Sequence, residues 1–144
     1  MQNIKFIGAP RRLFNKEMVS SMLVHFATQE GFKIDALEYN FVGLEKMYSL
    51  NKEYLNHTTD TDIITFDYSA NNLIAAEVYI SRKMMEINAD TNSQTIDKEA
   101  VRLVSHALFH CLGYKDKSAK EKKIMRNKEE EFLFAVSRET RQDV

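Results

Sequence analysis

The stretch "IDKEAVRLVSHALFHCLGYKD", residues 96–116, decides the fold of this 144-residue chain. Residues 96–112 give the strongest helix signal in the sequence, because apolar side chains recur there at helical spacing. Gly113 follows directly, and glycine is the residue that most often ends a helix. We therefore expect a helix over residues 96–112 that ends at Gly113.

Two histidines stand four residues apart near the end of this helix. Residues at this spacing lie on one helix face, so His106 and His110 can share one ion, at zinc–nitrogen distances of about 2.0–2.1 Å. Gly113 lets the chain turn back, which brings the Asp116 carboxylate within reach of the same ion. Two imidazoles and one carboxylate leave a fourth position open, as catalytic zinc sites require.

Other interpretations of the pair stay open. Histidines at helical spacing also arise by chance, and a buried histidine is usually a hydrogen-bonded core residue. The pair does not match the HExxH signature of metallopeptidases, because Ala107 and not glutamate follows His106.

Working outward, the remaining segments alternate between strand and helix periodicity. Ser118 and Glu121 form a capping box that opens a last helix. The other expected elements are a strand at 4–7, a helix capped by Asn15, a strand at 35–42, a helix at 44–55, strands at 61–69 and 73–81, and a short helix near 82–89. This order predicts an α+β fold in which a four-stranded sheet packs with about five helices, as one domain over residues 1–144.

The composition limits the classes of function. The net charge is −1, so any nucleic-acid partner must be bound by a local patch. No apolar run approaches the roughly 20 residues of a membrane span, so we expect no membrane partner. Cys111 is the only cysteine and the start lacks a secretory signal, which favours the cytoplasm; Cys111 itself is expected to be a small buried residue.

Three blocks carry a resemblance to a known family: "LNKEYLNHTTDTDIITF" (50–66), "IAAEVYIS" (74–81) and "SHALFHCLGYKDKSAKEKKIM" (105–125). The last resembles the H-G-x-L-H-L-x-G-Y-D-H signature of the YbeY family of rRNA maturation endoribonucleases. The resemblance implies a small mixed sheet and a metal held by three histidines. It also implies cleavage of single-stranded RNA in the 3′-end maturation of small-subunit rRNA and in ribosome quality control, with small-subunit components as partners.

Carried over by position, His106 and His110 match the first two ligands of the family. Asp116 stands where the third histidine belongs. An aspartate can bind zinc, so we expect one Zn²⁺ per chain, or another divalent transition metal; the carboxylate favours harder ions such as manganese.

The chain departs from the family elsewhere. Leu55 replaces an arginine that would bind phosphate, and His57 is a partial substitute or simply a surface residue. Glu77 replaces the aspartate of a G-D pair and either orients the site or is solvated. Asp62 matches a family aspartate, with a cap or turn role as the alternative.

A basic segment follows the proposed metal ligands. Residues 115–128 contain seven lysines and arginines but only Asp116 and Glu121 as acids. Such a segment can bind phosphates, with Tyr54 and Tyr114 stacking on bases, or it can be a solvated helix face in which the tyrosines only pack. The glutamates at 129–131 are expected to repel RNA.

Three functions follow from these patterns. The leading hypothesis is a metal-dependent, single-strand-specific endoribonuclease of rRNA maturation, with His106, His110 and Asp116 at its centre. The second is a ribosome-assembly module that binds RNA with weak or no catalysis. The third is a metallopeptidase or another zinc hydrolase.

Overall fold

The computed structural model describes residues 3–55 and 61–142 of the chain. The strands are β1 (Ile4–Ile7), β2 (Lys33–Val42), β3 (Ile63–Asp67) and β4 (Leu73–Ser81). The helices are α1 (Lys16–Gln29), α2 (Leu44–Leu50), the short π-helix η1 (Asn51–Leu55), α3 (Arg82–Thr91), α4 (Ile96–Cys111) and α5 (Ala119–Gln142). The element order is the one that the sequence predicts.

The strands form one mixed sheet in the order β1-β2-β4-β3. β2 runs parallel to both β1 and β4, with Tyr39 opposite Val78. β3 is antiparallel to β4, with Ile64 opposite Tyr79. β1 and β3 are therefore the two edge strands, and the expected small mixed four-stranded sheet is confirmed.

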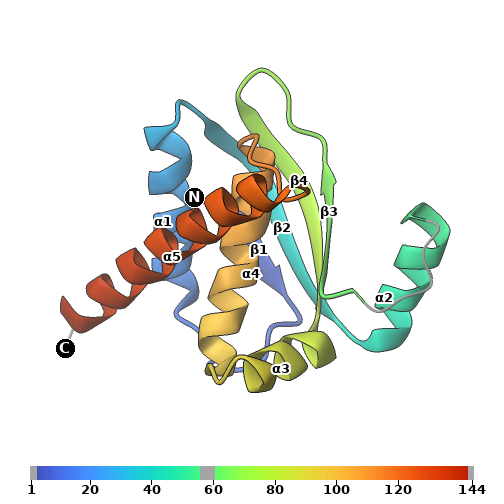
Figure 1. Ribbon diagram of the computed structural model, residues 1–144. Coiled ribbons are helices and arrows are strands. Elements are labelled where there is room, and N and C mark those ends of the chain that lie inside the picture. Colours follow the sequence, from blue (N-terminus) through green and yellow to red (C-terminus); the bar gives the residue numbers. More distant parts are fainter. Residues whose placement is uncertain (1–2, 56–60, 143–144) are drawn as a thin grey trace.

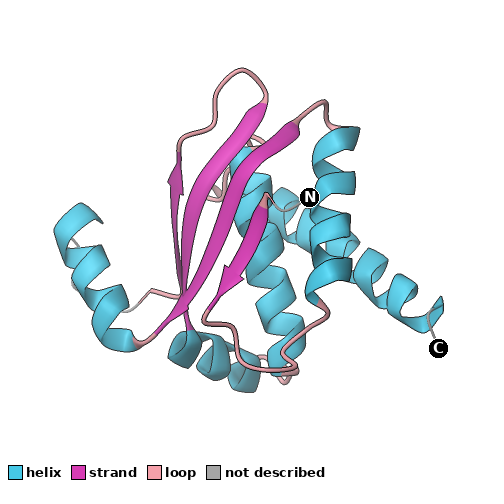
Figure 2. Ribbon diagram, turned by 180° about the vertical axis from the view of Figure 1, so that it is seen from behind, coloured by secondary structure: helices cyan, strands magenta, loops and turns pink. Residues whose placement is uncertain are grey.

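Helices α1, α4 and α5 lie on one face of this sheet, as Figures 1 and 2 show from opposite sides. The alternation along β2 explains this arrangement, because Leu37, Tyr39 and Phe41 are buried while the residues between them are only partly so. A smaller cluster of Met47, Leu50 and Ile64 packs α2 beside β3 and β4.

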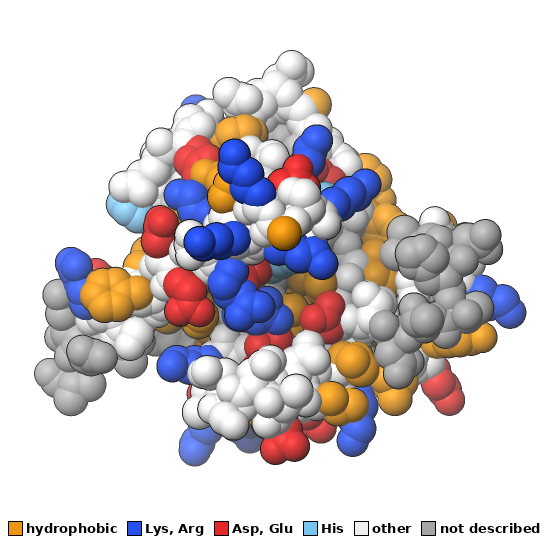
Figure 3. All heavy atoms as spheres, viewed as in Figure 1, with side chains coloured by type: hydrophobic (Ala, Val, Ile, Leu, Met, Phe, Trp, Pro, Cys, Tyr) orange, Lys and Arg blue, Asp and Glu red, His pale blue; other side chains and the backbone are white. Residues whose placement is uncertain are grey.

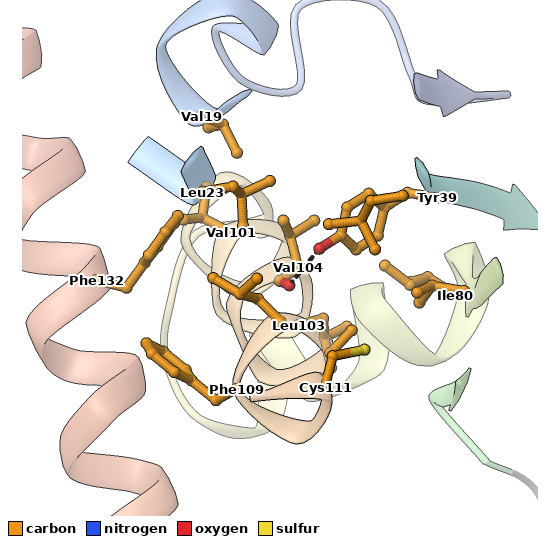
Figure 4. Packing of buried hydrophobic residues seen from close by; sticks show 14 of the residues in the cluster. Val19, Leu23, Tyr39, Ile80, Val101, Leu103, Val104, Phe109, Cys111 and Phe132 are labelled. Carbon is orange, nitrogen blue, oxygen red and sulfur yellow. Dashed lines mark hydrogen bonds between the residues drawn. The ribbon is translucent and has the colours of Figure 1, made fainter. Parts of the chain in front are cut away.

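The main core forms where α4 crosses the sheet (Figure 4). The Tyr39 hydroxyl donates a hydrogen bond of 2.8 Å to the Val104 carbonyl, which fixes α4 on β2. The Phe109 ring lies 5.9 Å from Phe26 on α1 and 6.4 Å from Phe132 on α5, measured between ring centroids. α4, the helix predicted over residues 96–112, thus lies at the centre of this core.

Some boundaries differ from the prediction. The helix expected over 44–55 ends its α-helical part at Leu50 and continues as the π-helix η1. The strand expected over 61–69 is shorter, Ile63–Asp67, because Asp67 accepts a hydrogen bond from the Ser69 backbone and starts the turn. Among the helices of the described residues, none combines the length with the apolar character that a bilayer span needs.

Candidate functional site

A polar cleft of about 550 Å³ lies between edge strand β3 and the helices α4 and α5. Its lining includes all three predicted metal ligands, His106, His110 and Asp116. The other lining residues are Thr61, Asp62, Ile63, Ile64, Thr65, Arg102, Leu103, Lys122, Met125, Arg126 and Glu129. Strand, helix and turn therefore converge on the place that the histidine spacing indicates.

His106 is held at the bottom of this cleft by a buried carboxylate. Its Nδ1 lies 2.6 Å from Oε2 of Glu129, and the Glu129 side chain is only 2% exposed. We assign a proton to Nδ1, because an ionised carboxylate can only accept hydrogen bonds. The other ring nitrogen, Nε2, is thereby left to face the cleft.

Asp116 reaches the same imidazole from beyond the end of α4. The helix ends at Cys111, and Gly113 has a φ of 108°, which side chains with a Cβ rarely adopt. This turn returns the chain so that Oδ2 of Asp116 lies 3.3 Å from Nε2 of His106. The predicted return of Asp116 toward the histidine pair is what the structure has.

His110 lies one turn further along α4 and lines the same cleft as an exposed side chain. In this position its side chain does not form a single ion-binding group with His106 and Asp116. Within residues 3–55 and 61–142, no three His, Cys, Asp or Glu side chains are grouped so that they could hold one ion. The structure thus brings His106 and Asp116 together and leaves His110 beside them.

The His106–Asp116 pair fits a metal ion. Two ligand atoms about 2.1 Å from a tetrahedral ion lie about 3.4 Å apart, and the observed separation is 3.3 Å. In the neutral imidazole with its proton on Nδ1, both facing atoms carry lone pairs, so both could bind a cation placed between them. A histidine whose second nitrogen bonds a carboxylate is also the usual arrangement of zinc-bound imidazoles.

Glu129 is the residue of the site that sequence reasoning missed. It belongs to the run 129–131 that is expected to repel RNA, but its carboxylate is buried against His106 and Arg102. A signal for it exists. Glu129 lies four residues after Met125 and three before Phe132, both buried, so a carboxylate interrupts the apolar stripe of α5.

Two cations of the basic segment line the cleft, Lys122 and Arg126. Both are exposed and one helical turn apart, and Lys and Arg side chains gather over the first half of α5 in Figure 3. Lys128 instead lies 3.9 Å from Glu30 and over the Tyr114 ring. The basic segment is therefore divided between two surfaces, and only part of it faces the cleft.

The two tyrosines proposed for base stacking lie outside the cleft lining. The Tyr114 hydroxyl donates a hydrogen bond of 2.9 Å to Glu30, and the Tyr114 ring packs on Phe109. Burial is the main cause that raises the pKa of Tyr114, and the hydrogen bond to Glu30 raises it further. Tyr54 packs edge-on against Phe66 at 5.4 Å. Both rings thus have packing roles in this structure.

Of the described positions that match the family, one lines the cleft and another does not. Asp62 lines the cleft and accepts a hydrogen bond of 3.0 Å from Asn88. Glu77 is exposed on β4 outside the cleft lining, as the solvated alternative predicts. His57 lies outside the described residues.

Cys111, next to His110, is buried as expected. Burial and the nearby Asp67 carboxylate raise the pKa of its thiol to about 12. The thiol therefore stays protonated at neutral pH and supplies no nucleophile.

Fold and cleft define a class of protein: an α+β domain with a histidine–carboxylate cluster at the edge of a mixed sheet. The family model described as endoribonuclease YbeY matches residues 10–137. The chain belongs to the endoribonuclease YbeY family.

Named relatives agree with this assignment. An endoribonuclease YbeY of Flavobacterium johnsoniae is 36% identical over 115 residues, which cover 80% of each chain. One from Parabacteroides distasonis is 34% identical over 126 residues, covering 88% of this chain and 89% of the relative. A solution structure of a Thermotoga maritima protein has a TM-score of 0.64 and 21% identity, covering 97% of this chain and 93% of that one, and shares the fold.

Proposed function

We propose that this chain is a metal-dependent, single-strand-specific endoribonuclease that acts in the cytoplasm on the 3′ end of small-subunit rRNA and in ribosome quality control. The observation that carries the proposal is the 3.3 Å approach of His106 Nε2 and Asp116 Oδ2 in the cleft of a YbeY-family chain. His106, Asp116 and, after a change of side-chain rotamer, His110 would hold one Zn²⁺ or a similar divalent ion.

When bound, such an ion makes water a usable nucleophile near neutral pH and withdraws charge from the scissile phosphate. The residues of the chain provide the rest. Glu129 accepts a hydrogen bond from Nδ1–H of His106 and so aims Nε2 into the cleft. Lys122 and Arg126 stand at the cleft wall, where they would bind the phosphates on either side of the cleaved bond.

The choice of single-stranded RNA rests on the family assignment and on the charge of the cleft wall. The residue after His106 is the buried Ala107, so α4 offers no carboxylate where a peptidase of the HExxH type needs one. Two observations favour the second candidate, an RNA-binding module of ribosome assembly with weak or no catalysis. Asp116 replaces the third histidine of the family, and the three proposed ligands of the described structure are not grouped around one point.

The test combines metal content with cleavage. The purified protein is assayed for bound zinc, and then for zinc-dependent cleavage of labelled single-stranded and double-stranded RNA and of an unstructured peptide. His106→Ala and His110→Ala should lose both zinc and RNA cleavage. His25→Ala is the matched control, because His25 is exposed on α1 in a separate groove.

Each function has its own outcome. Zinc-dependent cleavage of single strands that only the cleft histidines support establishes the nuclease. RNA binding without cleavage by the zinc-loaded protein establishes the binding module. Cleavage of the peptide and not of the RNA establishes a peptidase.

A further inference from the structure

A largely buried charged cluster adjoins the cleft, whose lining includes two of its members, Arg102 and Glu129. Glu99 on α4 and Glu129 on α5 each have a side chain only 2% exposed. Arg102 lies between them, 19% exposed. Buried charges of this kind cost desolvation free energy and are weak evidence for a gain in stability, so another role for the cluster must be considered.

The guanidinium of Arg102 bridges the two carboxylates. Its Nε donates to Oε1 of Glu99 at 3.0 Å and its Nη2 to Oε2 of the same residue, a paired contact. Its Nη1 donates to Oε1 of Glu129 at 3.2 Å. The planar fork of arginine makes these three bonds at once. A lysine ammonium also has three donors, but they radiate from one nitrogen and do not reproduce the paired contact with a carboxylate.

The two oxygens of Glu129 therefore have separate partners. Oε1 receives Arg102, and Oε2 lies 2.6 Å from Nδ1 of His106. With Oε1 held, the carboxylate cannot rotate, and Oε2 must keep its direction toward the imidazole. The direction of the His106 ring, and the choice of the ring nitrogen that carries the proton, then depend on Arg102, to which the ring makes no hydrogen bond of its own.

We propose that Arg102 is a positioning residue: acting through Glu129, it fixes the rotation and the tautomer of the His106 imidazole so that Nε2 presents its lone pair to the cleft. This rests on the proposed function for the identity of the ion, but the positioning itself belongs to the metal-free protein. A purely structural Arg102 would support folding and leave both the tautomer and the metal affinity of the folded protein unchanged.

The main variant is Arg102→Lys, which keeps the charge and removes the fork. We expect its zinc affinity, measured by competition with a chromophoric chelator, to fall about tenfold or more, as loss of an outer partner of a ligand does. The matched control is Arg138→Lys. Arg138 is also an arginine of α5, but it is exposed and lines a separate groove, so zinc affinity should stay within twofold of wild type.

The second measurement needs no metal. Long-range ¹H–¹⁵N spectra of the metal-free protein at pH 8 report which ring nitrogen of His106 is protonated. Wild type and Arg138→Lys should show one tautomer, protonated at Nδ1. Arg102→Lys should show a mixture of both tautomers.

The outcomes decide the matter in each case. Folded Arg102→Lys that keeps a single tautomer and binds zinc within twofold of wild type overturns the proposal. Should Arg102→Lys not fold, Glu129→Gln, which keeps the shape of the side chain, is read by the same two measurements and the same thresholds. Should wild type bind no zinc, the proposed function fails, and the tautomer spectra alone decide the role of Arg102.

Discussion

The Nε2 atom of His106 lies 3.3 Å from Oδ2 of Asp116, although the end of α4 and a glycine turn separate the two residues along the chain. The turn determines this approach, and the approach puts a nitrogen and an oxygen donor on one point of the cleft. His106 and Asp116 thus already stand in position to share an ion, whereas His110 would first have to change its side-chain rotamer.

The first prediction concerns the oxygen donor. Asp116→Asn keeps the size of the side chain but removes its charge, so zinc affinity should fall at least about tenfold. Asp116→His supplies a nitrogen donor at the same place and should bind zinc at least as tightly as wild type. Isothermal titration with zinc measures both, and equal affinities of Asp116→Asn and wild type would exclude Asp116 as a ligand.

The second prediction concerns the turn. Gly113 has a φ of 108° and nothing within 4 Å of an added Cβ, so Gly113→Ala is strained by its backbone and not by a clash. The free energy of unfolding should fall by about 1–3 kcal/mol, and zinc affinity should fall with it because the turn aims Asp116.

Gly31→Ala is the matched control for this substitution. Gly31 has a φ of 82° and also nothing within 4 Å, but it follows α1 and is not part of the cleft lining. It should lose similar stability in guanidinium unfolding and keep the zinc affinity of wild type. Equal zinc affinity in Gly113→Ala would show that the turn does not position Asp116.

The third prediction concerns RNA binding. Lys122→Gln combined with Arg126→Gln should weaken binding of a single-stranded RNA and reduce the slope of log Kd against log salt by about 1.4, since each phosphate contact to a single strand contributes about 0.7. Fluorescence anisotropy over a salt series measures the slope.

Lys120→Gln combined with Lys123→Gln removes the same charge from the same helix at exposed positions outside the cleft lining. This control should change the slope much less. A similar change in both double variants would mean that α5 attracts RNA by its overall charge and has no defined phosphate contacts.

The fourth prediction concerns alkaline pH. Burial is the main cause that raises the pKa of Tyr39 well above its ordinary value of 10.0. Its contribution to stability is therefore present below pH 10 and is lost as the pH rises further, because the unfolded chain releases the phenol proton while the folded protein keeps it.

Tyr39→Phe removes both this dependence and the hydrogen bond to Val104. It should lower the free energy of unfolding by about 1 kcal/mol at pH 7 and decline less than wild type above pH 10. Urea unfolding at pH 7, 9 and 10.5 gives the comparison. A parallel decline in both proteins would place the alkaline sensitivity elsewhere.

The parts of the fold that the sequence predicted are those set by local periodicity. The α4 helix, its histidine face and the Gly113 turn lie within 21 residues, and spacing alone orders them. The Ser118 hydroxyl accepts from Glu121 N–H at 3.1 Å, and Glu121 accepts from Ser118 N–H at 2.9 Å, as the capping box predicts. Such signals involve residues three or four apart and do not depend on tertiary packing.

The parts that could not be predicted depend on contacts between distant segments. Glu129 is 23 residues from His106, on another helix, and looked like one of three solvated glutamates. The pairing of Arg102 with Glu129 and the place of β3 beside the cleft arise only when α5 and the sheet pack on α4. The π-helical end of the segment 44–55 leaves no periodic signal that separates it from an α-helix.

The hydrogen bond from His106 on α4 to Glu129 on α5 has a thermodynamic consequence. The imidazole acquires its fixed direction only when the two helices are docked, so a cation that prefers the directed ring must also favour the docked arrangement. The affinity for the ion and the free energy of helix docking are then linked. A substitution that weakens the packing of α5 on α4 should therefore weaken ion binding, even where no ligand has been altered.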